Sequence, residues 1–298
     1  MLKKLMKHDW IALSKKILAI NIGLLAATIL GIISFQTPLW TSNMPYLDLL
    51  AMLILLINII AFIIAGAGVT IYLAVFFYKN LFTDEGYLMH TLPVKSSQLI
   101  LSKLFTGFLA QILTIINIIV CVLLLVMGAI VGFDGFSELP EFFKAIGNIF
   151  STIAKAMDMN LALFIIVLIV YAIIAALCSI MVIYGSLCIG QMFSKRRIMW
   201  SIVFYFVLYT IQQAVLTIGL AAFAQPQIEK IDTYSYQLSG SVVTSPSIDL
   251  TELERMASEG ILNMVTQTLA FSALITALAA VGLFFLSKYM MDRKLNLE

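Results

Sequence analysis

The chain of 298 residues is 62% hydrophobic and only 11% charged, whereas soluble domains contain roughly 45–50% apolar and 25% charged residues. So few charges would not cover a water-facing surface, and a membrane is the solvent that fits this composition. The net charge of +2 creates no field that would attract nucleic acid, so we expect no nucleic-acid partner.

Six apolar stretches are each long enough to cross a bilayer, which takes roughly 20 residues. They predict an all-α polytopic membrane protein that forms one domain, residues 1–298. The predicted spans are residues 17–35, 49–78, 104–133, 161–190, 199–224 and 261–287. None of them contains Asp, Glu, Lys or Arg. The second and third exceed what one bilayer needs, so we expect them to tilt or to project into the cytoplasm.

The basic residues gather on one side of this six-span plan. That side carries Lys3, Lys4, Lys7, Lys15, Lys16, Lys79, Lys95, Lys103, Lys195, Arg196, Arg197, Lys288, Arg293 and Lys294. The other side carries only Lys144, Lys155, Lys230 and Arg255. The positive-inside rule therefore predicts a multi-pass protein of the plasma membrane with both termini in the cytoplasm.

Three segments outside the spans have recognisable patterns. Residues 2–16 place apolar side chains at helical spacing with lysines opposite, which predicts an amphipathic interfacial helix whose lysines face anionic lipid headgroups. Residues 134–160 are predicted to be extracellular and to include an amphipathic helix over 138–157, with Pro140 in its first turn. The second extracellular segment, 225–260, is predicted to be a polar loop that ends in a short helix with a capping box at Thr251 and Glu254.

Several chemistries are missing from the sequence. There is no phosphate-binding GxxxxGK[ST] loop, and the two histidines, His8 and His90, are both predicted to be cytoplasmic. We therefore expect no catalytic residue, metal or cofactor in this chain. The charge-free spans also disfavour an ion-coupled transporter, because proton and ion relays need ionisable groups inside the bilayer.

The spans contain neutral polar side chains instead. These either hydrogen-bond between helices, which is the simpler interpretation, or line a translocation path. The candidates for such a path are Asn58, Gln111, Asn117, Gln212, Gln213 and Asn263. Apolar walls with scattered amides suit an amphipathic peptide, a lipid or a hydrophobic drug better than a small ion.

The loop between the second and third spans, residues 79–103, is unusually apolar. Thr83 or Asp84 can cap a short helix that begins at Glu85, and Pro93 disfavours helix at Leu92. Its apolar side chains indicate a partner surface.

This loop, with the stretches NLFTDEGYL, TLPV and SSQLILSK, resembles the first cytoplasmic loop of bacterial ABC type-2 transporter permeases. The closing residues 287–298 resemble the tail of the same proteins. The resemblance implies pairing with a second permease half, as a homodimer or a heterodimer, and docking of a cytoplasmic ATPase subunit that holds ATP and Mg. It also implies that the loop is a coupling helix seated on that ATPase. The residues assigned to this contact are Asp84, Glu85, Gly86, Tyr87, Leu88 and Pro93, together with Lys195, Arg196 and Arg197.

The resulting prediction is the membrane-spanning permease subunit of an ATP-driven ABC exporter, which moves an amphipathic or hydrophobic substrate. Export as the direction comes from the resemblance alone. The alternative is a non-transporting membrane scaffold or immunity protein that binds a partner or peptide through its extracellular segments.

Overall fold

The structure, a computed structural model, describes residues 2–37, 40, 45–83, 95–133, 135–156, 160–193, 195–241 and 250–293. The regular elements within these ranges are all helical. They are α1 (Leu2–Gln36), α2 (Pro45–Phe82), α4 (Ser96–Phe133), the 3₁₀ helix η1 (Phe136–Glu138), α5 (Leu139–Ala156), α6 (Leu161–Gly190), α7 (Arg197–Ser241) and α8 (Leu250–Arg293). The predicted all-α, polytopic fold is confirmed.

Six helical segments in the described part are long and apolar enough to cross a membrane. They are Lys3–Gln36, Leu49–Phe82, Ser96–Phe133, Leu161–Gly190, Arg197–Ala222 and Thr266–Asp292. Many of their large apolar side chains are exposed, among them Leu18, Ile63 and Ile166. Monomeric soluble proteins rarely expose contiguous apolar surface on this scale, so the surface is built for lipid.

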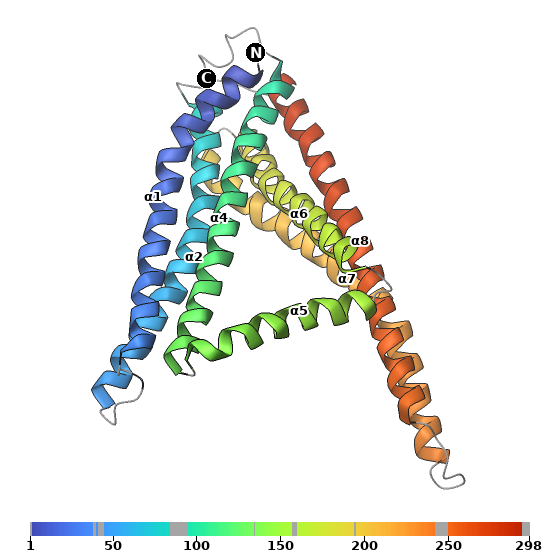
Figure 1. The fold of residues 1–298 in the computed structure, drawn as a ribbon. Coiled ribbons are helices and arrows are strands. Elements are labelled where there is room, and N and C mark those ends of the chain that lie inside the picture. The colour runs from blue at the N-terminus through green and yellow to red at the C-terminus, as the bar shows by residue number, and fades with distance from the viewer. Residues whose placement is uncertain are drawn as a thin grey trace.

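The helices form two legs that meet at one end of the molecule and diverge towards the other (Figure 1). Helices α1, α2 and α4 make the first leg, and α6, α7 and α8 make the second. The end of the molecule where the legs meet, which we call the basic end, contains the starts of α1, α4 and α7 and the ends of α2, α6 and α8. The end of α1, the start of α2 and α5 lie at the opposite, diverging end, where α5 bridges from α4 to α6.

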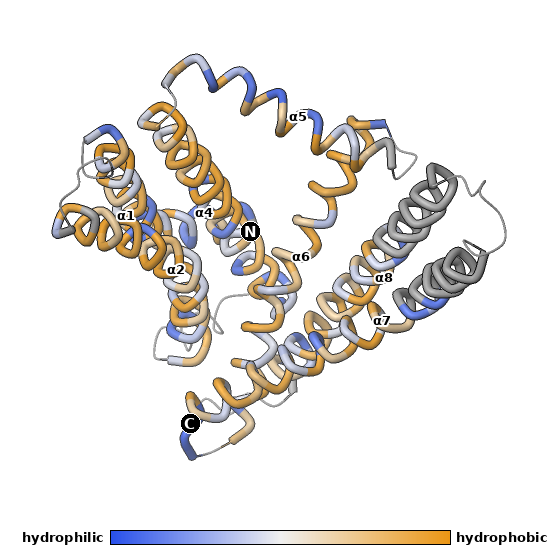
Figure 2. Tube along the Cα trace, turned by 90° about the horizontal axis from the view of Figure 1, so that it is seen from below, coloured by the Kyte–Doolittle hydropathy of each residue, from blue (hydrophilic) through white to orange (hydrophobic). Residues whose placement is uncertain are grey.

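Viewed from the diverging end, the α7–α8 pair stands apart from the first leg (Figure 2). The tubes of the spans are mostly hydrophobic, whereas hydrophilic residues recur along α5. This alternation agrees with the predicted amphipathic helix over 138–157, which the structure forms as η1 and α5 with Pro140 as the second residue of α5.

Helix α1 differs from the expected interfacial helix followed by a span. It is continuous from Leu2 to Gln36, and its apolar stripe packs onto the protein. Leu13 and Ile17 are buried against Val69 and Leu73 of α2. The stripe that was expected to face lipid therefore forms part of the core.

The predicted polar loop over 225–260 is wrong for most of its length. Helix α7 continues through Pro226 to Ser241, and α8 begins at Leu250 and runs without interruption into the last span. The predicted short helix at Thr251 is thus the first turns of α8. Once a helix has formed, each added residue gains a hydrogen bond, so two paired spans extend readily beyond their apolar segments.

Candidate functional site

Of the residues assigned to ATPase coupling, only three lie in the described part of the chain. Residues 84–88 and Pro93 lie outside it. Lys195 and Arg196 are exposed in the short α6–α7 connection, where Arg196 has a φ of 57°. The connection is tight, because a Cβ added to Gly190 would lie 2.0 Å from Ser201 Oγ.

The largest cluster of buried apolar side chains among the described residues includes the end of α2 and the start of α4. Phe77 and Leu81 come from the last turns of α2, and Leu99 and Ile100 from the first turns of α4. They pack with Ile180, Met181, Ile183, Tyr184 and Cys188 of α6 and with Met291 of α8. The predicted loop 79–103 is thus helical at both ends, where α2 continues to Phe82 and α4 begins at Ser96. These two helix ends are fixed to the second leg.

Tyr184 belongs to this apolar cluster, which connects the two legs and which we call the joint. Its ring stacks on Phe77 with 3.9 Å between the ring centroids and 11° between the planes. Its hydroxyl donates to the carbonyl oxygen of Lys103, at 3.2 Å. Gly107 provides the space, since a Cβ there would lie 2.9 Å from the Tyr184 hydroxyl. One side chain of α6 thus contacts both α2 and α4.

A buried polar cluster fastens α1 to the start of α4. Lys103 Nζ donates to Asp9 Oδ1, and Ser102 Oγ donates to Asp9 Oδ2 at 2.7 Å. All three residues are fully buried, and Lys103 Nζ also lies 4.7 Å from the centroid of the Phe76 ring. A buried charge is tolerated only when it is paired and hydrogen-bonded, so this cluster holds the helices in one arrangement.

Sequence reasoning missed this cluster. It counted Lys103 among the basic residues of the cytoplasmic side and did not single out Asp9. The available signal was position: Asp9 is four residues after Leu5 and four before Leu13, so it stands on the apolar stripe of α1. A lone carboxylate on such a stripe requires a partner.

Asn117, one of the candidate path residues, bonds α4 to α1. Its Nδ2 donates to Asn21 Oδ1 at 2.9 Å and to the Asn21 carbonyl oxygen at 3.2 Å. Asn21 Nδ2 in turn donates to Thr114 Oγ1, at 3.2 Å. These contacts form a hydrogen-bond network between the spans α1 and α4.

Two further candidates lie at other helix interfaces. Gln111 Nε2 of α4 donates to Ser179 Oγ of α6, at 3.0 Å. Gln212 of α7 is hydrogen-bonded to the Cys178 thiol of α6.

The remaining candidates lie on α2, α7 and α8. Asn58 of α2 is buried, and a Cβ added to Gly31 of α1 would lie 2.8 Å from its Nδ2. Gln213 is exposed on α7, and Asn263 lies in α8. The described candidates are thus distributed over several interfaces, and their use as a translocation path stays a prediction.

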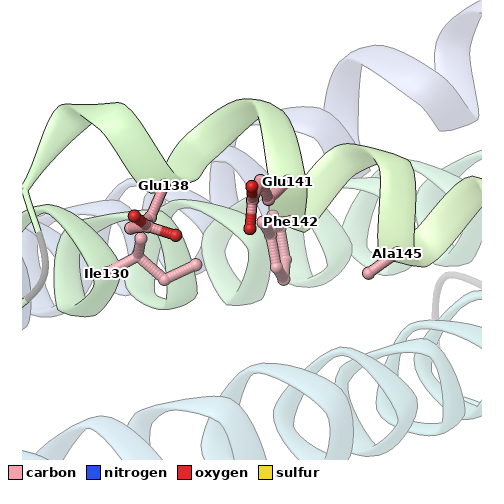
Figure 3. A pocket seen from close by; sticks show the side chains of 5 residues that line it. All are labelled: Ile130, Glu138, Glu141, Phe142 and Ala145. Atoms are coloured by element: carbon pink, nitrogen blue, oxygen red, sulfur yellow. The ribbon is translucent and has the colours of Figure 1, made fainter.

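A surface hollow of about 620 Å³ lies at the diverging end, between α4 and the η1–α5 segment (Figure 3). Ile130 lines it from α4, and Glu138, Glu141, Phe142 and Ala145 line it from the other side. Both carboxylates are exposed to solvent. In the part of the chain that the structure describes, no His, Cys, Asp and Glu side chains group as a metal site.

Comparison with known protein families, curated proteins and solved structures finds no match for this chain. The resemblance to ABC type-2 permeases therefore rests on the loop and tail residues quoted above.

Proposed function

We propose that this chain is the membrane-spanning permease subunit of an ATP-driven ABC exporter. A separate cytoplasmic ATPase subunit holds ATP and Mg, and loop 84–94 transmits its movement to the membrane helices. The observation that carries the proposal is the position of the joint: the apolar cluster around Tyr184 lies directly beneath the two helix ends that flank this loop.

The geometry supports a mechanism in which α2 and α4 act as levers that transmit movement of the ATPase to the other helices. Helices α2 and α4 are 38 residues long each, and their ends are the points at which an ATPase would push. The Phe77–Tyr184 stack passes that movement to α6, and the Asp9–Lys103 pair passes it to α1. Because the legs meet at this end and diverge at the other, a small tilt here changes their separation at the diverging end.

The orientation follows from the charges. The basic end faces the cytoplasm by the positive-inside rule, so both termini are cytoplasmic. Lys103 does not contribute to this argument, since it is buried against Asp9. The exposed lysines at the start of α1 and the Lys195–Arg197 segment carry it instead.

The polar chemistry supports an energy source outside the chain. The ion pair between Asp9 and Lys103 lies near the basic end, and the polar side chains that bond at mid-span are neutral amides and hydroxyls. Such walls suit an amphipathic or hydrophobic substrate. They provide no relay for coupling to an ion gradient.

The experiment is ATP-dependent transport of a hydrophobic peptide or dye into inverted membrane vesicles. The variant Glu85→Arg with Leu88→Asp reverses a charge and inserts another in the predicted coupling helix. We expect it to abolish transport and assembly with the ATPase while membrane insertion is unchanged. The matched control, Glu85→Asp with Leu88→Ile, should retain both transport and assembly with the ATPase. If the disruptive variant assembles and transports normally, the coupling assignment is wrong.

A second candidate is a non-transporting scaffold or immunity protein that binds a partner or peptide at the diverging end. The exposed side chains of Phe136, Phe143 and Ile149 on the η1–α5 segment favour it. Protection against a peptide that persists when the ATPase subunit is inactive would support this candidate over the exporter.

A further inference from the structure

The outward face of α1 carries lysines that have no carboxylate partner in the described part of the chain. Lys3, Lys4, Lys7, Lys15 and Lys16 are all exposed, and the carboxylate of Asp9, on the same helix, is paired with Lys103. The apolar stripe of α1 is buried against α2 and α4. Its outward face is therefore what α1 offers to the surrounding membrane.

Lys15 stands within an apolar stripe on that outward face. Ile11, Leu18 and Ile22 are 53%, 62% and 55% exposed, and they lie four residues before, three after and seven after Lys15. This spacing puts all four side chains on one side of the helix. A lysine among lipid-facing side chains extends its ammonium to the headgroup level, so the boundary between water and acyl chains lies here.

Lys16 lies beside an aromatic side chain of the neighbouring helix. Its Nζ is 5.6 Å from the centroid of the Tyr72 ring. Tyr72 is partly buried, so its apolar ring and polar hydroxyl suit the membrane–water interface, where tyrosine is enriched. A cation of α1 and a tyrosine ring of α2 therefore lie at the same depth.

The surface below this pair, towards the bilayer centre, is open. A Cβ added to Gly23 would meet nothing within 4 Å, and one added to Gly68 would meet only Ile20 Cδ1, at 4.0 Å. Gly23 is seven residues after Lys16 and Gly68 is four before Tyr72, so both glycines share a face with the residues above them. An acyl chain can lie along this smooth surface between α1 and α2.

We propose that Lys16 and Tyr72, with Lys15 beside them, form a binding site for one anionic phospholipid. The lysine ammonium groups and the Tyr72 hydroxyl donate to the lipid phosphate, and an acyl chain lies over Gly23 and Gly68. The site does not depend on the permease proposal. It sets the depth of the protein, because it puts the start of the hydrocarbon layer at Lys16 and Tyr72 and the Asp9–Lys103 cluster on its aqueous side.

The test is lipid titration of the delipidated full chain in detergent, followed by native mass spectrometry. Phosphatidylglycerol and phosphatidylcholine with identical acyl chains are compared. We expect Lys16→Gln to reduce the preference for phosphatidylglycerol about fivefold, the effect of one lysine near an anionic surface. Lys4→Gln is the matched control and keeps the preference, since it removes the same charge from the same helix away from Tyr72. Gly68→Leu fills the surface on which the acyl chain lies, so it should weaken the binding of both lipids equally.

Three results would overturn the site. Lys16→Gln could retain the wild-type preference, or Lys4→Gln could lose as much of it, which would indicate a diffuse charge effect. Displacement of phosphatidylglycerol by millimolar inorganic phosphate would indicate an anion site that needs no lipid. Lys16 is exposed, so its substitution leaves the packed interior of the helices intact.

Discussion

The carboxylate of Asp9 and the ammonium of Lys103 form an ion pair in which both side chains are completely shielded from solvent. The pair joins the first turns of α1 to the first turns of α4, next to the loop predicted to receive the ATPase. Ser102 completes the hydrogen bonding of the carboxylate, at 2.7 Å. This arrangement leads directly to a stability prediction.

Replacing Lys103 by Met should destabilise the protein by about 3–5 kcal/mol, because it leaves the Asp9 charge buried without its partner. The double variant Asp9→Leu with Lys103→Met should recover most of this loss. Thermal unfolding in detergent measures both. Lys7→Met, an exposed lysine of α1, is the control and should change the free energy of unfolding by less than about 0.5 kcal/mol. A loss for Lys103→Met no larger than that of the control would contradict a stabilising role.

Tyr184 should affect stability and coupling differently according to the substitution. Tyr184→Phe removes the hydrogen bond to Lys103 but keeps the stack on Phe77, and should cost about 1 kcal/mol. Tyr184→Ala removes the joint between the legs and should cost about 3–5 kcal/mol. We expect Tyr184→Phe to retain ATP-dependent transport and Tyr184→Ala to lose it, even at a temperature where both variants remain folded. Equal transport by the two folded variants would show that Tyr184 takes no part in coupling.

Close approach of α1 and α4 at the diverging end can be tested with glycine substitutions. A Cβ on Gly132 would lie 2.4 Å from the Phe35 carbonyl oxygen, and backbone cannot yield as a flexible side chain does. Gly132→Ala should therefore lower the melting temperature clearly, whereas Gly23→Ala, which meets no atom within 4 Å, should leave it unchanged. Comparable melting temperatures for the two variants would show that the helices do not approach as described.

Asn117 distinguishes a packing role from a translocation role. Asn117→Leu removes its bonds to Asn21 and should destabilise the protein by about 0.6–1.7 kcal/mol, which spans the average and the maximum for hydrogen bonds between membrane helices. If Asn117 only packs, transport per folded molecule stays at the wild-type value. A large loss of transport without loss of stability would place Asn117 on the substrate path.

The sequence was sufficient to predict the six spans, because a bilayer imposes a minimum length of apolar residues that is visible in one dimension. It also predicted α5, whose apolar stripe recurs at helical spacing. The long α7–α8 hairpin was missed, because the polar residues after Ala224 carry no apolar stripe and Pro226 argues for a break. A helix that has already formed gains a hydrogen bond for each added residue, so α7 and α8 extend beyond the apolar segments that define the spans.

The candidate site was harder to predict for a related reason. Asp9 and Lys103 are 94 residues apart, and nothing local in the sequence pairs them. The face of α1 that meets the protein was recognised as apolar but assigned to lipid, since an apolar stripe alone does not identify what covers it. Which amides of the spans meet, such as Asn21 with Asn117, likewise depends on how the helices pack.

The central claim is that an ATPase subunit binds this chain at its basic end. The direct measurement is affinity purification of the tagged full chain from its native membranes in mild detergent, with identification of the bound subunits and assay of ATP hydrolysis. We predict recovery of a subunit with a GxxxxGK[ST] loop, in equal amount to the permease halves, and loss of that subunit in the Glu85→Arg, Leu88→Asp variant. Recovery of the chain without any ATPase, together with substrate movement that persists after ATP depletion, would contradict the account.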